Sequence, residues 1–173
     1  MSLYESTVLQ FKNTLTQIDK WLVAGAALAE AKNFDVSVLL NARLAPDQFP
    51  LLRQIQSACD AAKSTAARLT GQEPPKHPDT ETTLPEIRAR IATVLAYLDT
   101  FTAANFVGAE ERKIVLLFIP NQYLLGAGFV TQLQLPNFYF HAAHSYAILR
   151  HNGVALGKAD YIGQLSLRPV NAG

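Results

Sequence analysis

The chain has 173 residues, a length that suits one domain, residues 1–173, able to bury most of its apolar side chains without a disulfide or structural metal. Its 15 basic and 14 acidic residues are mixed along the sequence and give a formal net charge of +1. So little charge imbalance leaves no positive surface to attract nucleic acids or anionic membranes, and we expect neither as a partner.

The apolar segments are too short to cross a membrane. The longest uninterrupted apolar run without glycine, Ile114 to Ile119, falls far below the ~18 residues of a spanning helix. The N-terminus lacks the basic region and apolar core of a secretory signal. Cys59 is the single cysteine, which excludes an internal disulfide. We expect a cytoplasmic protein.

The first segment predicts a long amphipathic helix, because its apolar residues recur at alternating steps of four and three. These residues are Tyr4, Val8, Phe11, Leu15, Ile18 and Leu22. The helix is expected to continue to about Ala31. Asp35 is then expected to cap a short helical turn from Val36 to Asn41.

The second helix is predicted to open at Asp47, whose carboxylate accepts first-turn amides, with Pro50 in the first turn and Gly71 as a left-handed stop. Small residues toward the end of its apolar face predict a closely packed neighbouring helix. That face consists of Leu52, Ile55, Cys59, Ala62, Ala66 and Leu69.

Residues 71–82 are rich in proline and predict a surface connection in which His77 is solvated. Thr83 and Glu86 have the spacing of a capping box and predict the start of a third helix. Its apolar face runs through Leu84, Ile87, Ile91, Val94, Leu98 and Phe101.

Short apolar runs at 113–118 and 123–127 predict a hairpin, and a fourth helix is expected from Pro136 to Arg150. The tail from Val154 is expected to lie across the end of the bundle. The pattern therefore predicts an all-α, up-and-down four-helix bundle with a short irregular or β-hairpin insert between the third and fourth helices.

Three of the four histidines occur on the predicted fourth helix, within an arc of roughly 80°. His141 and His144 are separated by only ~4.5 Å of helix rise and can meet one metal ion. His151 lies another ~10 Å along the axis and cannot join them. A third ligand would come from Gln54, Cys59 or Asp60 on the second helix.

The alternative interpretation is structural. His141 then bonds to a partner inside an aromatic cluster with Phe138 and Tyr139, while His144 faces the rim, since buried polar groups are usually paired. Cys59 also has two interpretations. A thiolate stabilised by His141 is a nucleophile, whereas a thiol on an apolar helix face behaves as a small hydrophobe.

A set of charged residues surrounds the start of the second helix and the end of the fourth, namely Arg43, Asp47, Arg150, Lys158 and Asp160. Such a set is able to clamp a carboxylate or phosphate ligand. Equally, Asp47 serves as a cap, and Arg150 with Asp160 pins the tail. No Glu-x-x-His pair, phosphate-binding glycine loop or nucleophile elbow is present.

Several blocks of the sequence resemble a bacterial family of unknown function in the DinB/YfiT-like superfamily. They are Arg43–Pro50 (RLAPDQFP), Gln56–Lys63 (QSACDAAK), Ala67–Gly71 (ARLTG), Leu135–His141 (LPNFYFH), Ile148–Val154 (ILRHNGV) and Leu156–Lys158 (LGK). The resemblance implies a four-helix bundle. It also implies a divalent metal held by three histidines, one on the second helix and two spaced by four on the last, with thiol-dependent transferase activity. This sequence has no histidine on the second helix, and His141 and His144 are three residues apart.

We therefore expect a metal-free module that binds a small molecule or a protein partner and needs no cofactor. Apolar helix faces and aromatic residues, Trp21 and Phe129 included, predict a homodimer. The alternative is a thiol transferase that uses zinc, nickel or iron on His141 and His144. The candidate ligand-binding residues are Arg43, Asp47, Gln54, Cys59, His141, Arg150, His151, Lys158 and Asp160.

Overall fold

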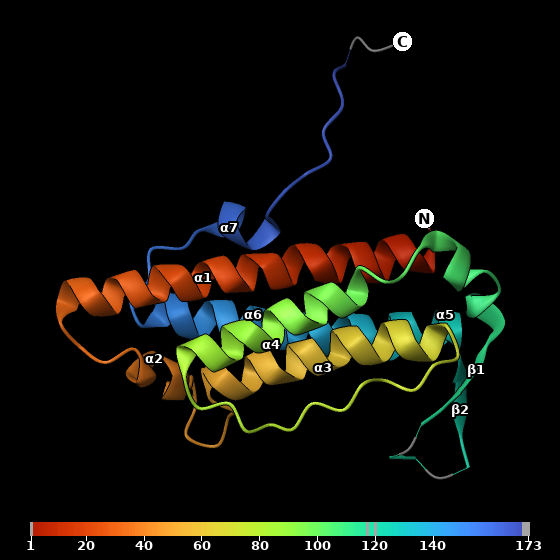
Figure 1. The fold of residues 1–173 in the computed structure, drawn as a ribbon, viewed down its shortest axis with the longest axis horizontal. Helices are drawn as coiled ribbons and strands as arrows, with labels where there is room; N and C mark the ends of the chain where they lie inside the picture. The colour runs from red at the N-terminus through yellow and green to blue at the C-terminus, as the bar shows by residue number, and fades with distance from the viewer. Residues whose placement is uncertain (1, 117, 120, 171–173) are drawn as a thin grey trace.

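The computed structural model describes residues 2–116, 118, 119 and 121–170. Four long helices run alongside one another and form a bundle (Figure 1). They are α1 (Gln10–Lys32), α3 (Leu51–Leu69), α4 (Leu84–Leu98) and α6 (Leu135–His151). The predicted all-α bundle is confirmed.

Shorter elements connect the four helices. A π-helical turn, Glu5–Leu9, leads into α1, and α2 (Ser37–Asn41) follows it. After α4 come two 3-10 turns (Ala103–Phe106 and Ala109–Glu111), strands β1 (Lys113–Val115) and β2 (Tyr123–Leu125), α5 (Gly126–Gly128) and a second π-helical turn (Phe129–Gln134). The last element is α7 (Lys158–Ile162).

The predicted apolar faces form the core. Val8, Phe11, Leu15 and Ile18 from the first segment are fully buried, and the faces of α3 and α4 join them. On α6 the aromatic ring of Phe138 packs against Phe11, with ring centroids 4.1 Å apart. Each helix therefore contributes one apolar stripe to a shared interior.

The capping box of α4 is present as predicted. The Thr83 hydroxyl accepts a hydrogen bond from the Glu86 amide, and the Glu86 carboxylate accepts one from the Thr83 amide at 2.9 Å. The predicted cap at Asp47 is wrong, because α3 begins at Leu51 after Pro50. The residue before a proline is excluded from the helical region, so Phe49 cannot belong to a helix that opens at Asp47.

The predicted hairpin is confirmed in a shorter form. Strands β1 and β2 pair antiparallel, with Ile114 opposite Leu124. Gly126 follows β2 and lies against the backbone of Ala109, so that a Cβ atom at position 126 would be 1.9 Å from the Ala109 carbonyl oxygen. The absence of a side chain at Gly126 thus allows the hairpin to return into the bundle.

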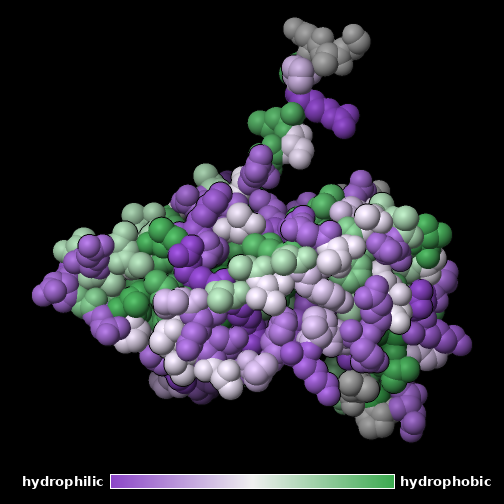
Figure 2. Space-filling model, in the orientation of Figure 1, coloured by the Kyte–Doolittle hydropathy of each residue, from purple (hydrophilic) through white to green (hydrophobic). Residues whose placement is uncertain are grey.

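The tail lies along α1 and not across the end of the bundle as predicted. The Trp21 indole N–H donates to the Asp160 carbonyl oxygen at 3.2 Å, and Tyr161 stacks on the Trp21 ring. The Gln164 amide still donates to Asn13 Oδ1 on α1 at 3.2 Å, and toward its C-terminal end the chain leaves the bundle surface (Figures 1 and 2). Trp21 and Phe129 are each 1% exposed, so neither supplies the apolar surface invoked for a homodimer.

A cluster of ionic side chains fastens the connection 71–82 to the bundle. The side chain of Arg90 on α4 is 2% exposed and contacts three carboxylates. Its Nη2 donates to Asp60 at 2.7 Å and Asp79 at 3.0 Å, and its Nη1 donates to Glu81 at 3.0 Å. Lys63 also binds Asp60, at 2.7 Å. Arg90 therefore joins α3, α4 and the connection.

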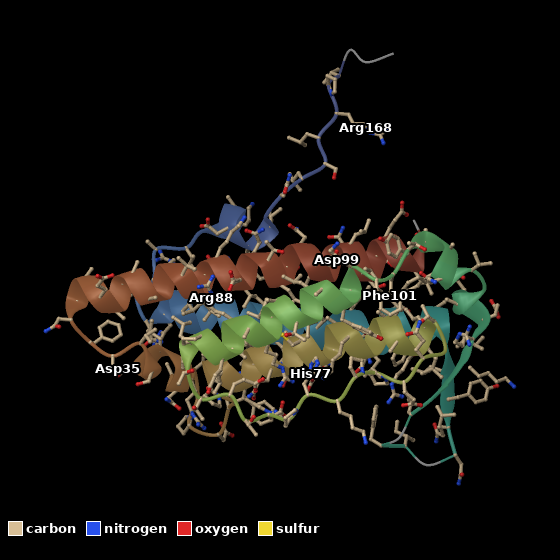
Figure 3. All side chains as sticks on the ribbon, in the orientation of Figure 1. Asp35, His77, Arg88, Asp99, Phe101 and Arg168 are labelled. Carbon is tan, nitrogen blue, oxygen red and sulfur yellow. The ribbon has the colours of Figure 1, made fainter. Side chains whose placement is uncertain are left out.

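His77 is partly buried by this arrangement and not solvated as predicted (Figure 3). Its Nδ1 is inaccessible, and burial together with the cations of Lys63 and Arg90 lowers the pKa of the ring. The cause lies in the packing of residues 71–82 onto α3 and α4, which proline content alone does not predict.

Among the described residues, no single helix has the length and apolar character needed to cross a membrane. Helix α4 meets those criteria only together with residues Ala103–Glu111, as a pair bent by 78°.

Replacing Gly126 with alanine is predicted to lower the free energy of unfolding by about 3 kcal/mol, because the new methyl group meets backbone that cannot rotate away. Gly128→Ala is the matched control: its Cβ would lie 3.3 Å from the flexible Gln132 side chain and 4.0 Å from the Leu124 side chain, and it would meet no backbone. We expect a change below about 1 kcal/mol there. Urea denaturation of both variants checks this, and equal losses would contradict the account.

Replacing Arg90 with methionine is predicted to cost about 3 kcal/mol, since three carboxylates lose their shared cation. The control is Arg88→Met on the same helix: Arg88 pairs with Asp19 at 2.7 Å, but its side chain is 43% exposed (Figure 3). Exposed pairs contribute at most about 1 kcal/mol. Denaturant midpoints for the two variants should therefore differ clearly, and similar midpoints would show that the Arg90 cluster is not stabilising.

Candidate functional site

A cleft of about 320 Å³ opens between α3 and the helical segment formed by residues 129–141. The hairpin contributes Leu116 and Phe118 at one end, and His141 lies at the other. The residues that line it are Ser57, Asp60, Ala61, Ser64, Arg68, Leu116, Phe118, Phe129, Leu133, Gln134, Asn137 and His141. Polar and apolar groups therefore share one concave surface, as in small-molecule sites.

The α3 wall follows from helical spacing. Ser57, Ala61, Ser64 and Arg68 recur at steps of four, three and four, which places them on one face of α3. The buried seam residues Cys59, Ala62 and Ala66 occupy the neighbouring face. One face of α3 thus packs into the core while the next borders the cleft.

The opposite wall comes from Phe129, Leu133, Asn137 and His141, which are spaced by four. A proline has no N–H and crowds the carbonyl group four residues earlier, so regular α-helical bonding fails before Pro136. The wider π-helical turn Phe129–Gln134 occupies this stretch. The helix therefore continues through the proline and carries all four side chains to the cleft.

Two polar contacts bridge the walls. The Thr65 hydroxyl donates to Gln134 Oε1 at 3.0 Å, and the Gln54 amide group meets the His141 ring, with Gln54 Oε1 at 2.7 Å from Nδ1. Because residue 54 faces residue 141 while residue 65 faces residue 134, the two helices run antiparallel. Both contacts lie at the border of the cleft and fix how the walls face each other.

Gln54 determines which nitrogen of His141 carries the proton. Its Nε2 donates to the Phe49 carbonyl oxygen at 3.2 Å, which directs Oε1 toward the ring. An amide oxygen only accepts, so His141 Nδ1 must donate. Burial, with smaller contributions from His144 and Arg53, lowers the pKa of His141. The ring is therefore neutral at pH 7, and Nε2 carries the lone pair.

His144 is held differently. Its Nδ1 lies 2.6 Å from the Phe140 carbonyl oxygen one turn earlier, and its ring packs on Phe140 with centroids 4.0 Å apart. A carbonyl oxygen also only accepts, so Nδ1 donates and only Nε2 is left as a possible metal ligand.

The donors expected from α3 do not fit a metal site. Cys59 is fully buried in the core and does not line the cleft, and burial raises the pKa of its thiol to about 12, so it is not a nucleophile at neutral pH. Asp60 Oδ1 is bound by Arg90 and Lys63. Within the described part of the chain, no three His, Cys, Asp or Glu side chains cluster as a metal site. The residues present do not match the triad implied by the resemblance.

The charged set predicted as a clamp is not brought together. Arg43 donates to the Pro46 carbonyl oxygen, Arg150 to the Val154 carbonyl oxygen, and Asp160 accepts from the Gly157 amide at the start of α7. Asp47 lies in a turn before α3, and Lys158 and His151 are exposed. None of these six residues lines the cleft, whereas Gln54 and His141 meet at it.

Sequence reasoning missed most of the cleft residues, including Ser57, Ser64, Arg68 and Asn137. A signal was present, since the α3 residues form a stripe at steps of three and four beside the apolar seam. In the sequence alone that stripe looks like an ordinary exposed helix face. Only the structure, in which the opposing helix and the hairpin lie beside it, identifies it as a wall of the cleft.

The stability of the protein is predicted to fall as the pH drops from 7 to 5. His141 and His77 have folded-state pKa values below that of unfolded histidine, about 6.5. Below pH 6.5 the unfolded chain therefore binds protons that the folded chain does not, and the loss levels off below the folded pKa values. Carboxylates whose pKa is lowered in the folded protein, such as Glu81, change the stability at lower pH than the two histidines do.

Urea titrations between pH 5 and 7 test this, with His141→Gln and His77→Gln compared with the parent. Each substitution should reduce the dependence on pH, whatever it does to the stability at pH 7. An unchanged slope in both variants would contradict the assignment of neutral rings.

Comparison with known proteins identifies a family and a similar solved structure for this fold. The family described as a domain of unknown function (DUF1993) matches residues 3–162. The crystal structure of a DinB family member protein from Shewanella denitrificans is 48% identical and superposes with a TM-score of 0.93, over 96% of this chain and 95% of that one. No curated protein matches the chain. The resemblance found in the sequence is confirmed, and the chain belongs to the DUF1993 family, with the fold of a DinB family member.

Proposed function

We propose that this protein binds a small organic molecule in the cleft between α3 and α6 and does so without a metal ion. The observation that carries the proposal is the Gln54–His141 hydrogen bond, which holds a neutral ring with its Nε2 lone pair left for another donor. His141 then acts as a hydrogen-bond acceptor within the cleft.

The composition of the cleft supports this function. Ser57, Ser64 and Asn137 bring two hydroxyl groups and an amide to its walls. Gln134 places its side-chain amide in the wall, where it contacts the Thr65 hydroxyl at 3.0 Å. Leu133 supplies apolar contact, backed by Phe129, which is itself 1% exposed. A few directional polar groups on an apolar wall orient a ligand and exclude molecules of the wrong shape.

The competing function is a divalent-metal-dependent thiol transferase in which His141, His144 and a third group hold zinc, nickel or iron. Such a site requires both rings to present lone pairs to one ion. The bonds from His141 to Gln54 and from His144 to Phe140 use Nδ1 of each ring and leave Nε2 as a possible metal ligand, so the third ligand distinguishes the two functions. Opposite His141, α3 offers the amide of Gln54 where the triad needs an imidazole, which favours the metal-free binder.

Ligand-observed NMR with a fragment library tests the binding function. Ser64→Trp is predicted to abolish the binding of most fragments, because an indole at this position occupies the cleft between α3 and Leu133. Ala96→Trp, at an exposed position on α4, is the matched control and should bind the same fragments as the parent.

Fragments that bind Ser64→Trp as well as the parent would contradict the site. The same preparations, made without a histidine tag, are dialysed against zinc, nickel and iron(II). Stoichiometric metal that is lost in His141→Ala would favour the transferase, whereas the proposed binder retains no metal after dialysis.

A further inference from the structure

Arg68 stands at the hairpin end of the cleft and has no counter-ion in the described part of the chain. Its Nη1 donates to the Val115 carbonyl oxygen at 3.2 Å, which fixes the guanidinium beside β1. A backbone carbonyl uses one N–H and leaves the positive charge without a neutralising partner. Arginine presents its remaining N–H groups in a planar fork that matches a carboxylate.

Further cations surround this end of the cleft. Arg68 also borders an adjoining hollow of about 360 Å³ that Arg112 and Lys113 line together with Glu73. The Arg112 Nε donates to the Leu69 carbonyl oxygen at 3.0 Å, and Lys113 lies 5.0 Å from the centre of the Tyr123 ring. Within this hollow three cations face one carboxylate, and Arg68, which has no ion-pair partner among the described residues, remains able to bind an anionic group.

The other end of the cleft has the opposite preference. His141 Nε2 is a neutral acceptor, and the Asp60 carboxylate at this end is already paired with Arg90 and Lys63. A neutral nitrogen lone pair accepts a hydrogen bond from a hydroxyl or amine, and a carboxylate has no hydrogen to donate to it. The two ends therefore recognise two different groups of one molecule.

The distance between the ends favours an elongated ligand. Eleven residues separate Ser57 from Arg68 on α3, which corresponds to about 16 Å of helix axis. Between them lie Ala61 and Ser64 on one wall and Leu133 and Phe129, with Gln134 and Asn137, on the other, and Leu116 lies beside the hairpin. Ala61, Leu133 and Leu116 offer apolar contact along this span, with the polar groups of Ser64, Gln134 and Asn137 beside them.

We infer that the cleft takes an elongated organic carboxylate, with the carboxylate on Arg68, the hydrocarbon chain between Leu116, Phe129 and Leu133, and a terminal hydroxyl donating to His141 Nε2. The inference rests on the proposed small-molecule function and adds the chemical class and the orientation of the ligand. The hairpin, by fixing Arg68 through Val115, sets where the carboxylate binds.

Three eight-carbon probes separate the contributions: 8-hydroxyoctanoate carries both groups, octanoate lacks the hydroxyl and 1,8-octanediol lacks the carboxylate. Amide chemical-shift titrations of the full-length protein give the dissociation constants. We expect 8-hydroxyoctanoate to bind most tightly, and Arg68→Gln to weaken both carboxylates by about tenfold or more while the diol is unaffected.

Arg112→Gln is the matched control, because Arg112 lies at the same end of the protein but does not line the cleft. It should weaken the carboxylates far less than Arg68→Gln. His141→Phe keeps a ring of similar size and should weaken 8-hydroxyoctanoate but not octanoate. Circular dichroism and melting temperatures of each variant confirm that the comparison concerns folded protein.

Equal effects of Arg68→Gln and Arg112→Gln would overturn the inference, as would a diol that binds as tightly as the hydroxy acid. Absence of binding by all three probes at millimolar concentration also overturns the ligand class. In that case, fragments that bind the parent but not Ser64→Trp still support the cleft as a binding site. If those fragments fail as well, the proposed function fails with it.

Discussion

Helix α3 is able to lie close to α6 because its inward face carries small side chains, and the cleft between the two helices depends on this pairing. Ala58, Ala62 and Ala66 are buried, and these two helices share the most extensive helix–helix contact in the described structure. Interaxial distance depends on side-chain size at the contact, so alanine allows an approach that leucine would prevent. Only at such an approach do Gln54 and His141, and Thr65 and Gln134, come within hydrogen-bonding distance.

The same pairing explains how the two walls of the cleft face each other. Polar bridges at two levels of α3 and α6 hold the helices at a fixed rotation, which leaves the stripe from Ser57 to Arg68 facing the stripe from Phe129 to His141. The hairpin then closes one end, and Gly126 allows its return strand to pass against Ala109. A glutamine opposite His141 orients the imidazole for hydrogen bonding, whereas the metal triad implied by the DinB-like resemblance needs a lone pair from α3 at this place.

Much of the fold could be predicted from the sequence, because apolar spacing reports directly on which helix face is buried. The faces of α1, α3 and α4, the capping box at Thr83 and the hairpin near Ile114 were all predicted. Three features were not. The start of α3 depends on the conformational restriction that Pro50 places on Phe49, and His77 is buried through a connection held by Arg90. The position of α7 depends on Trp21, whose indole finds its acceptor at Asp160.

The site was predictable only in part, since a cleft is a property of two surfaces. Sequence identified Gln54 and His141 as candidates but supplied no reason to pair them with each other. Arg68 and Ser64 belong to a stripe that only the opposing helix turns into a wall. The charged residues from Arg43 to Asp160 attracted attention because of their density in the sequence, yet each uses its side chain locally or lies in solvent.

The central claim is that Gln54 holds His141 as a neutral ring with the proton on Nδ1 and the Nε2 lone pair toward the cleft. Long-range ¹H–¹⁵N correlation spectra of imidazole side chains, recorded at pH 7 on protein labelled with ¹⁵N-histidine, measure this directly. The account predicts a protonated Nδ1 and an unprotonated Nε2 for His141, and loss of that single tautomer in Gln54→Leu. A doubly protonated ring, or a proton on Nε2, would contradict it.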